Sequence, residues 1–450
     1  MGMHAPRRAA PAAREPVVVV GGGWAGLAAA VELTDLGHRV IVLESSRQLG
    51  GRARRLAFGS DGVDNGQHLL IGAYHETLRL MDRVGMQEHH ACLRLPLRLE
   101  VRSGRDTLLL KAPHLPAPVH LAVALLAGRG LRLGERLRAL RFALRHYLSG
   151  FELPEDASVA DLLADQPARL TRLLWNPLCL ATLNTVPEQA SARVFLRVLR
   201  DAFARKRCDS DLLIPRVDLG RSFPEPALDF IERHGGQVRL GARVTALEIR
   251  SHRVAGLWLG DERIAASQVI LAVPPNIAAR LLSAHAGSAL LAGTLATFEY
   301  EPIATVYLRY PAHVHLPAEM VGLADGMAQW LFDRRVYGQP GLLAAVISGP
   351  GEHTDMTREA LAARVAGEIA AQFPHFPAPV DQLVVREKRA TFRCTVGIDD
   401  HRPHARTPLA GCWLAGDYTD TGYPATLEGA VRSGVQCARL VDTQLRQTTP

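Results

Sequence analysis

The chain has 450 residues, of which 48% are hydrophobic and 22% are charged. This length and composition allow a large buried core and exceed what one core usually supports, so we expect two domains. The formal net charge is +7 at pH 7 and the pI is about 9.3. A positive balance favours an anionic partner, such as a phospholipid surface, nucleic acid or an acidic substrate, but does not choose among them.

Several classes of protein are excluded at this stage. The six cysteines lie apart without a Cys-x-x-Cys pair, so neither a zinc site nor a disulfide framework is indicated. Residues 1–16 are rich in Ala, Arg and Pro and lack the apolar segment of a signal peptide, so we expect a disordered tail. No run approaches the ~18 apolar residues of a membrane-spanning helix. We expect a cytoplasmic protein, and a peripheral position on the inner face of the cytoplasmic membrane stays open.

Residues 17–44 predict a nucleotide-binding unit. Val17 to Val20 are apolar on both faces, as in a central strand of a parallel sheet. Gly21, Gly23 and Gly26 follow at the G-x-G-x-x-G spacing, which lets the backbone approach a pyrophosphate. The alanine-rich segment after them predicts a helix whose N-terminus would hold the phosphates, and a second strand follows. It ends at Glu44, where a carboxylate can accept hydrogen bonds from an adenosine ribose.

Two polar turns come next. Gly51 and Arg52 form either an ordinary surface turn or a flexible turn whose cation reaches diphosphate oxygens. Residues 64–68 then read Asp-Asn-Gly-Gln-His. Amides and a neutral imidazole both donate and accept hydrogen bonds, which suits a heteroaromatic ring with mixed polar edges. We favour a binding site over a solvated turn because this segment follows the glycine turns closely.

Residues 76–213 have a mainly helical pattern. Six apolar side chains share one face of the segment 133–148 at 3.6 residues per turn: Leu133, Leu137, Leu140, Leu144, Tyr147 and Leu148. Arg138, Arg141 and Arg145 lie beside them. Together with the apolar segment 121–127, this pattern resembles a helix at a membrane interface whose arginines reach phosphates. An equally weighted alternative is a surface helix that packs its leucines on the core.

Three later segments complete the pattern. Residues 175–185 mix apolar side chains with Asn176 and Asn184, as in a pocket wall with orienting groups or in a core with two capping side chains. Alternation returns from Val238 through Val244 to Leu259 and predicts a meander. Residues 268–273 predict a buried strand that stops at two prolines, since a proline disfavours helical geometry in the residue before it.

The C-terminal region predicts one more strand and helix. Residues 412–415 predict a short strand that ends at Gly416 and Asp417, and a helix begins near Thr426. A carboxylate at a strand end can accept hydrogen bonds from ribityl or sugar hydroxyls, and a helix N-terminus can hold a negatively polarised ring edge. Alone, this corner would be a routine β-turn-α connection.

Together these segments resemble the flavin amine oxidase and carotenoid desaturase superfamily over nearly the whole chain. The matching strings are the first glycine turn, Gly-Gly-Arg (50–52), Val-Ile-Leu-Ala-Val-Pro-Pro (269–275), Ala-Gly-Asp (415–417) and Leu-Glu-Gly-Ala (427–430). The resemblance implies FAD and an α/β fold, with a Rossmann-like FAD-binding domain interleaved with a mixed helical and sheet substrate domain. We expect residues 17–75, 220–280 and 385–446 to form the FAD-binding domain, and residues 76–219 and 281–384 to form the substrate domain, which would face the membrane.

The resemblance also assigns residues to the cofactor. Those expected near the pyrophosphate, ribose and adenine are Gly21, Gly23, Ala25, Gly26, Glu44, Ser45 and a strand-borne Val244. Those expected near the diphosphate, ribityl chain and flavin ring are Gly51, Arg52, Gly66, Gln67, His68, Gly416, Asp417, Thr426 and Leu427.

Residues 64–68, 177–185 and 210–219 look like a narrower branch, the hydroxysqualene dehydroxylases of bacterial hopanoid pathways. The resemblance implies that hydroxysqualene loses its hydroxyl and receives a hydride from reduced flavin, giving squalene. Departure of an allylic or cyclopropyl-conjugated oxygen leaves a delocalised carbocation, which a hydride quenches if water is excluded. His68, Asp64 and Asn184 are our candidates for the acid or the orienting groups.

The same branch implies the partners. We expect a long apolar isoprenoid substrate and no nucleic acid, with a membrane surface contacted through residues 121–148. Only one dinucleotide fingerprint is present, so electrons would come from an external donor.

Alternative functions stay open. Amine oxidases of the superfamily usually keep a lysine on a strand of the substrate domain, and the comparable segment 297–310 has none, which makes amine oxidation less expected. A desaturase or oxidase of a polyprenoid would take a hydride from its substrate instead of giving one. A protein that only binds lipid or a partner protein would keep the flavin without catalysis.

Overall fold

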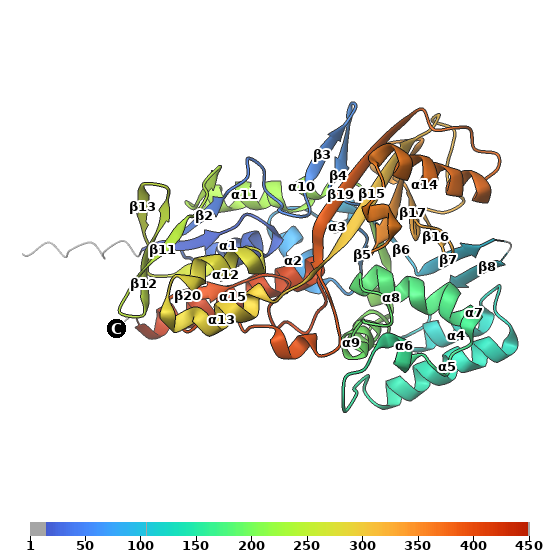
Figure 1. Ribbon diagram of the computed structural model, residues 1–450, viewed down its shortest axis with the longest axis horizontal. Coiled ribbons are helices and arrows are strands. Elements are labelled where there is room, and N and C mark those ends of the chain that lie inside the picture. Colours follow the sequence, from blue (N-terminus) through green and yellow to red (C-terminus); the bar gives the residue numbers. More distant parts are fainter. Residues whose placement is uncertain (1–14, 105, 449–450) are drawn as a thin grey trace, which may run out of the picture.

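The computed structural model describes residues 15–104 and 106–448, so the expected disordered tail lies almost entirely outside the described residues. A five-stranded parallel sheet forms one half of the molecule (Figure 1). Its strands, in spatial order, are β10 (Gln237–Leu240), β2 (Val40–Glu44), β1 (Val17–Val20), β14 (Val269–Leu271) and β20 (Cys412–Leu414). They come from three segments that are distant in the sequence.

Helices cover this sheet. The helices of this half are α1 (Trp24–Asp35), α2 (His75–Arg83), α3 (Glu88–Ala91), α10 (Leu219–Ser222), α11 (Pro224–Arg233), α12 (Pro275–Ser283), α13 (Ala289–Ala296) and α15 (Leu427–Thr448). The N-terminal helix α1 packs against both α11 and α15. The contact with α15 is close, since a Cβ at Gly434 would lie 2.1 Å from the carbonyl oxygen of Ala25.

Three small sheets flank this half. An antiparallel meander is formed by β11 (Ala246–Arg250), β12 (Arg253–Leu259) and β13 (Glu262–Ala265). The other two sheets pair β3 (Arg55–Phe58) with β4 (Asp61–Asp64), and β5 (Leu70–Ile71) and β6 (Cys92–Leu95) with β9 (Leu212–Pro215). Two expectations are wrong in detail. Val238 belongs to the parallel sheet because β10 pairs with β2, and Val244 lies in the link between β10 and β11 rather than on a strand.

A seven-stranded sheet forms the second half. Its strands, in spatial order, are β19 (Asp381–Phe392), β15 (Tyr300–Arg309), β18 (Leu342–Ser348), β17 (Trp330–Asp333), β16 (Met320–Leu323), β7 (Arg98–Ser103) and β8 (Asp106–Lys111). The hairpin of β7 and β8 shows that residues 76–213 are less helical than expected. Consecutive leucines such as Leu108 to Leu110 suit a helix as well as a strand, so periodicity alone does not separate the two.

Helices complete this half. One helix, α14 (Arg358–Gln372), contacts β15 and β19, while the remaining helices gather at the lower right of Figure 1. They are α4 (Val119–Ala127), α5 (Leu133–Leu148), α6 (Val159–Leu162), α7 (Ala168–Leu170), the π-helical turn η1 (Thr171–Trp175), α8 (Asn176–Leu183) and α9 (Ala192–Phe203). No helix among the described residues is both long and apolar enough to cross a membrane. The expected α/β fold class is confirmed.

Candidate active site

The two glycine turns near the start of the chain pack against each other. A Cβ at Gly26 would lie 2.0 Å from the carbonyl oxygen of Gly21, so the start of α1 rests directly on the end of β1. The Gly50 N–H donates to the Gly22 carbonyl at 2.9 Å, and a Cβ at Gly51 would lie 3.2 Å from the Cα of Gly23. Gly26 has no room for a Cβ and Gly51 has a φ of +60°, so glycine is required at the first and favoured at the second. The small residues leave room for a ligand beside the helix N-terminus.

Glu44 stands at the end of β2, where the ribose of a dinucleotide is expected. Its Oε2 accepts a hydrogen bond of 2.6 Å from the Gly22 N–H, and its Oε1 accepts one of 2.6 Å from the Ser46 N–H. The Ser45 hydroxyl also donates to Oε1, at 3.2 Å. The carboxylate is therefore held in place from both sides before any ligand binds.

The N- and C-terminal segments meet through an ion pair. Arg52 Nη2 donates to Asp417 Oδ1 at 2.8 Å, and Arg52 Nη1 donates to the Ala390 carbonyl at 2.9 Å. The loop that carries Asp417 leads from β20 to α15, so this pair ties the second glycine turn to the C-terminal corner. The structure thus brings together two parts of the expected FAD site that lie far apart in the sequence.

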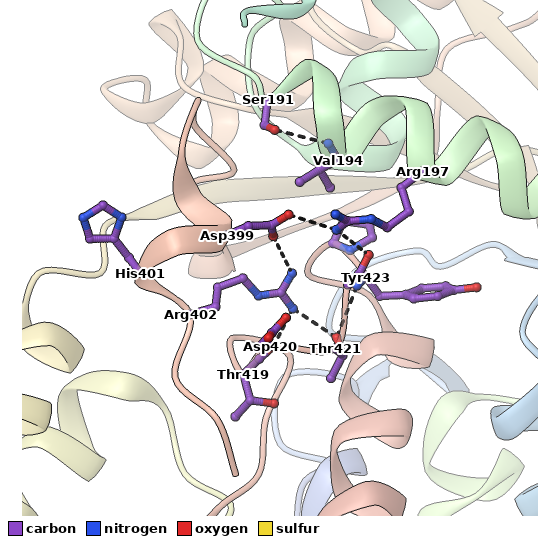
Figure 2. A network of polar contacts seen from close by, with 12 residues as sticks. Ser191, Val194, Arg197, Asp399, His401, Arg402, Thr419, Asp420, Thr421 and Tyr423 are labelled. Carbon is purple, nitrogen blue, oxygen red and sulfur yellow. Dashed lines mark hydrogen bonds and ion pairs between the residues drawn. The ribbon is translucent and has the colours of Figure 1, made fainter. Parts of the chain in front are cut away.

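A buried arginine fixes that C-terminal loop (Figure 2). Arg402 has a side chain with no exposed surface, and its Nη2 donates to the carbonyls of Asp417 at 3.0 Å and Thr419 at 2.6 Å and to the Thr421 hydroxyl at 3.0 Å. Its charge is balanced by Asp399, at 3.3 Å, which also accepts from Arg197 of α9 at 2.9 Å. This network connects the FAD-side loop to a helix of the other half.

A second buried arginine holds the loop 66–68 in place. Arg334 has no exposed side-chain surface, and its Nη1 donates to Gln67 Oε1 at 2.6 Å. Its guanidinium lies 3.7 Å from the centre of the Tyr337 ring, and the Tyr337 hydroxyl in turn accepts from Gln67 Nε2 at 2.9 Å. The Gln67 N–H donates to the Thr305 hydroxyl of β15 at 3.3 Å, which links the loop to the seven-stranded sheet.

His68 is held in one tautomer by its own loop. Its Nδ1 lies 2.7 Å from the carbonyl oxygen of Gly66, so the neutral ring carries its proton on Nδ1 and leaves Nε2 as an acceptor. Burial lowers the pKa of His68, and the hydrogen bond to Gly66 opposes that shift only in part. At neutral pH the ring is uncharged and suited to accept a hydrogen bond from a ligand.

The two other expected catalytic groups are engaged elsewhere. Asp64 is fully buried, and its Oδ1 accepts from the Leu219 N–H at 2.7 Å. Burial raises the pKa of Asp64 to about 6, and this effect outweighs the opposing attraction of Arg334, whose Nη1 lies 3.7 Å from its Oδ2. Asn184 donates to the Thr391 hydroxyl at 3.0 Å and the Pro302 carbonyl at 3.3 Å and accepts from the Gly349 N–H at 2.7 Å. Its side chain therefore fastens the end of α8 to strands of the sheet.

A cavity of about 1020 Å³ joins these groups. It exceeds the usual range of small-molecule pockets, roughly 300–1,000 Å³. All the expected site residues except Gly26 and Asp64 line it, namely Gly21, Gly23, Ala25, Glu44, Ser45, Gly51, Arg52, Gly66, Gln67, His68, Asn184, Val244, Gly416, Asp417, Thr426 and Leu427. The polar end is bounded by the glycine turns and the C-terminal loop. The remaining wall is largely aliphatic and aromatic and comes from the sheet and from α4, α5 and α8.

Tyr418 contributes to the wall of the polar end beside Asp417. Its hydroxyl is buried and has no hydrogen-bond partner among the described residues. Sequence reasoning missed the residues that hold this end in shape, Arg402, Asp399, Arg197 and Arg334, because a buried arginine has no local pattern that separates it from an exposed one.

Comparison with other proteins decides the family. The profile of the family described as flavin containing amine oxidoreductase matches residues 24–442. The chain belongs to this family. It is therefore an FAD-dependent oxidoreductase, as expected.

Named relatives narrow the likeness. The chain is 32% identical to the hydroxysqualene dehydroxylase of Rhodopseudomonas palustris, over 94% of this chain and 98% of that protein. It is 28% identical to the hydroxysqualene dehydroxylase of Zymomonas mobilis, over 94% of this chain and 98% of that protein. It is 27% identical to the 15-cis-phytoene desaturase of Solanum lycopersicum, over 96% of this chain and 79% of that protein. The resemblance to the hydroxysqualene dehydroxylases is confirmed.

A solved structure agrees with this fold. The chain aligns with a crystal structure of a putative protoporphyrinogen oxidase from Exiguobacterium with a TM-score of 0.71, at 18% identity, over 96% of this chain and 99% of that one. This likeness concerns the fold alone.

The glycine contact beneath the cofactor can be tested by substitution. Gly26→Val places side-chain atoms against the Gly21 carbonyl and Ala272, so we expect FAD affinity to fall by more than about tenfold. Flavin absorbance at matched protein concentration measures this loss. Gly367→Ala in α14 is the control, because a Cβ there meets nothing within 4 Å. A Gly26→Val protein that keeps a full complement of FAD contradicts the packing described here.

The shifted carboxyl gives a prediction on pH and stability. The pKa of Asp64 is about 6 when folded, against 3.8 for the ordinary carboxyl, so the folded state binds this proton more tightly than the unfolded state. Relative to Asp64→Asn, the wild type therefore loses free energy of unfolding as pH rises from about 4 to about 6, by about 3 kcal/mol in total, and no more above that. Urea unfolding of both proteins across this range measures the difference. If the difference in free energy of unfolding between the two proteins does not change with pH, the raised pKa of Asp64 is contradicted.

Proposed function

We propose that this enzyme removes the hydroxyl of hydroxysqualene to give squalene, within hopanoid or another triterpenoid pathway. The observation that carries the proposal is the long cavity, whose polar end suits FAD and whose remaining wall is apolar along most of its length. The likeness to hydroxysqualene dehydroxylases over nearly the whole chain supports the same substrate class. When bound, reduced FAD (FADH2) would supply the hydride that replaces the hydroxyl, and the hydroxyl would leave as water together with the second hydrogen of the reduced flavin.

Residues of this chain would bind FAD for this hydride transfer. We assign Gly21, Gly23, Ala25, Glu44, Ser45 and Val244 to the pyrophosphate, ribose and adenine, and Gly51, Arg52, Gly66, Gln67, Gly416, Asp417, Thr426 and Leu427 to the diphosphate, ribityl chain and ring. Gly26 acts by close packing rather than by contact. We propose that an external electron donor reduces FAD.

We assign different roles to the three catalytic candidates. His68 lines the cavity and offers a neutral Nε2, so it orients the substrate hydroxyl by accepting a hydrogen bond. Asp64 and Asn184 hold the cavity walls in position. Asp64 does so through Leu219 and Arg334. Asn184 does so through Pro302 and Thr391 on two strands and through Gly349 just after a third. Phe142 and Trp175 contribute aromatic rings to the apolar wall, which would exclude water from the substrate.

The helix α5 supports a membrane contact. It buries Glu135, Ala139, Phe142 and His146, and the Phe142 ring lies 4.9 Å from that of Trp175. Its leucine stripe points the other way, with Leu133 69% and Leu148 76% exposed. The alternative, in which these leucines pack on the core, is therefore wrong for all of them except the half-buried Leu140. Leu144 and Tyr147 are both exposed and line the cavity, so the cavity reaches the surface at this helix.

We propose that this surface rests on an anionic bilayer, from which the apolar substrate enters. Burial in lipid would remove the exposed leucines from water. The neighbouring Arg138, Arg141 and Arg145 are exposed and would contact the lipid phosphates. We propose that the enzyme lies on the inner face of the cytoplasmic membrane. The amine alternative is weakened, because no lysine lines the cavity among the described residues.

The reaction is tested with the FAD-loaded enzyme reduced under anaerobic conditions. Addition of hydroxysqualene should give one squalene per flavin and return the oxidised flavin spectrum. A polyprenoid desaturase behaves in the opposite way, since its substrate reduces oxidised flavin. Failure to form squalene contradicts the proposal, and bleaching of oxidised flavin by a polyprene favours the desaturase.

The membrane contact is tested by sedimentation with liposomes. Leu133→Glu combined with Leu148→Glu should weaken binding to anionic liposomes by at least about tenfold, because two side chains lose their burial in lipid. Neutralising Arg138, Arg141 and Arg145 should weaken binding to anionic but not to neutral liposomes. The control is Leu290→Glu, since Leu290 is 88% exposed on α13 at the other end of the long axis (Figure 1). Equal binding of all variants contradicts the contact.

A further inference from the structure

Polar side chains interrupt the apolar wall of the cavity where the end of α8 meets the seven-stranded sheet. They include Thr182, Asn184, Ser348 and Thr391. The Thr182 hydroxyl donates to the Leu178 carbonyl at 2.8 Å, and Asn184 donates to the Thr391 hydroxyl at 3.0 Å. The Ser348 hydroxyl, in contrast, makes no hydrogen bond to any described residue. Its hydrogen-bonding capacity is therefore left for a ligand.

The Ser348 hydroxyl can be reached from the cavity. Ser348 is 8% exposed and lines the cavity wall. Two other unpaired polar atoms of the wall, the Trp330 Nε1 and the Tyr418 hydroxyl oxygen, are completely enclosed by protein, whereas the Ser348 oxygen is not. An atom of a ligand in the cavity can therefore contact Ser348, although it cannot contact the other two.

The strand register places Ser348 near the loop 66–68. Ser348 stands opposite Ile303 of β15, which also lines the cavity, and Thr305 lies two residues further along the same face of β15. The Thr305 hydroxyl accepts a hydrogen bond of 3.3 Å from the Gln67 N–H. One strand spacing and two residues of rise place the Cα of Ser348 about 8 Å from that of Thr305. The Ser348 hydroxyl thus lies near the part of the cavity that we assign to the flavin ring.

Two side chains fix the backbone around this hydroxyl. The Ser348 N–H donates to Gln329 Oε1 at 2.7 Å, and the N–H of the following Gly349 donates to Asn184 Oδ1 at 2.7 Å. The end of β18 is therefore held in place before a ligand binds, which lowers the entropy cost of binding. A serine hydroxyl can donate one hydrogen bond, and the facing side chain of Ile303 offers no acceptor.

We propose that the Ser348 hydroxyl donates a hydrogen bond to the hydroxyl oxygen of the substrate and makes the cavity selective for a hydroxylated isoprenoid over the hydrocarbon product. This inference rests on the proposed function, in which the substrate has one oxygen and the product has none. The substrate hydroxyl in turn donates to His68 Nε2, so that two side chains hold one oxygen. After dehydroxylation both hydrogen bonds are lost, which weakens binding of the product. Ser348 is thus a specificity-determining residue.

The experiment uses the oxidised FAD-loaded enzyme, which binds substrate without turnover. Dissociation constants for hydroxysqualene and for squalene are measured by titration of the flavin spectrum in detergent micelles. Ser348→Ala should weaken hydroxysqualene binding by roughly three- to tenfold, because one hydrogen bond is lost, and should leave squalene binding unchanged. Ser348→Thr keeps a hydroxyl and should retain the preference for hydroxysqualene.

The matched control removes a different hydroxyl from the same wall. Thr182→Val is nearly isosteric, and the hydroxyl that it removes is already bonded to the Leu178 carbonyl, so the ratio of the two dissociation constants should stay as in the wild type. The melting temperature gives an independent readout. Ser348→Ala should not lower it in the ligand-free holoenzyme, because the hydroxyl has no protein partner to lose.

The outcomes separate this inference from the proposed function. A Ser348→Ala enzyme that binds both ligands more weakly by the same factor, or both as tightly as the wild type, overturns the role of Ser348 alone. A clear fall in the melting temperature of this variant also overturns it, since the hydroxyl would then have a structural role. A wild-type enzyme that binds neither ligand contradicts the proposed function, and the inference fails with it.

Discussion

The ion pair between Arg52 and Asp417 is the interaction on which the site depends. It joins residues 365 positions apart at 2.8 Å and so brings the second glycine turn to the loop between β20 and α15. Neither segment encloses a cofactor alone. Asp417 is oriented in turn because Arg402, fully buried, binds the carbonyl of Asp417 and the following loop. A buried charge is costly unless it is paired and hydrogen-bonded, and here Asp399 and the loop carbonyls provide both.

The cavity connects this polar corner to an apolar surface. One wall is the seven-stranded sheet, and the opposite walls are the helices α4, α5 and α8. Two of these helices, α4 and α5, also carry exposed large apolar side chains, including Val119, Leu126 and Leu137. Under the proposed function, the substrate would meet apolar side chains from the surface to the flavin end. By filling the apolar part of the cavity, the proposed substrate would itself keep water away from a carbocation.

Elements were predicted correctly where the sequence pattern reflects interactions between residues that are close in the chain. The strands around Gly21 and the helix 133–148 follow from apolar periodicity and turn chemistry, and both were predicted with nearly the observed bounds. Prediction failed where pairing with a distant strand decides the structure of a segment. Val238 alternates like its neighbours in the meander, yet β10 extends the parallel sheet, and the hairpin of β7 and β8 was hidden in a leucine-rich segment. Asn184 and Asp64 sit in strings that point to a site, but their polar atoms bind backbone and side chains of other elements.

The helix α5 shows the limit of periodicity most clearly. A stripe of leucines establishes which side chains share a face, and that part of the prediction holds. It does not establish what the face touches. Full burial of one leucine is worth about 1.5–3 kcal/mol, so a stripe normally packs on the core. In α5 that place is taken by the stripe of Glu135, Ala139, Phe142 and His146, where Arg169 pairs with Glu135 at 3.1 Å and Trp175 packs on Phe142. These partners of the buried face come from η1 and from α7, so residues that follow α5 in the chain decide its orientation.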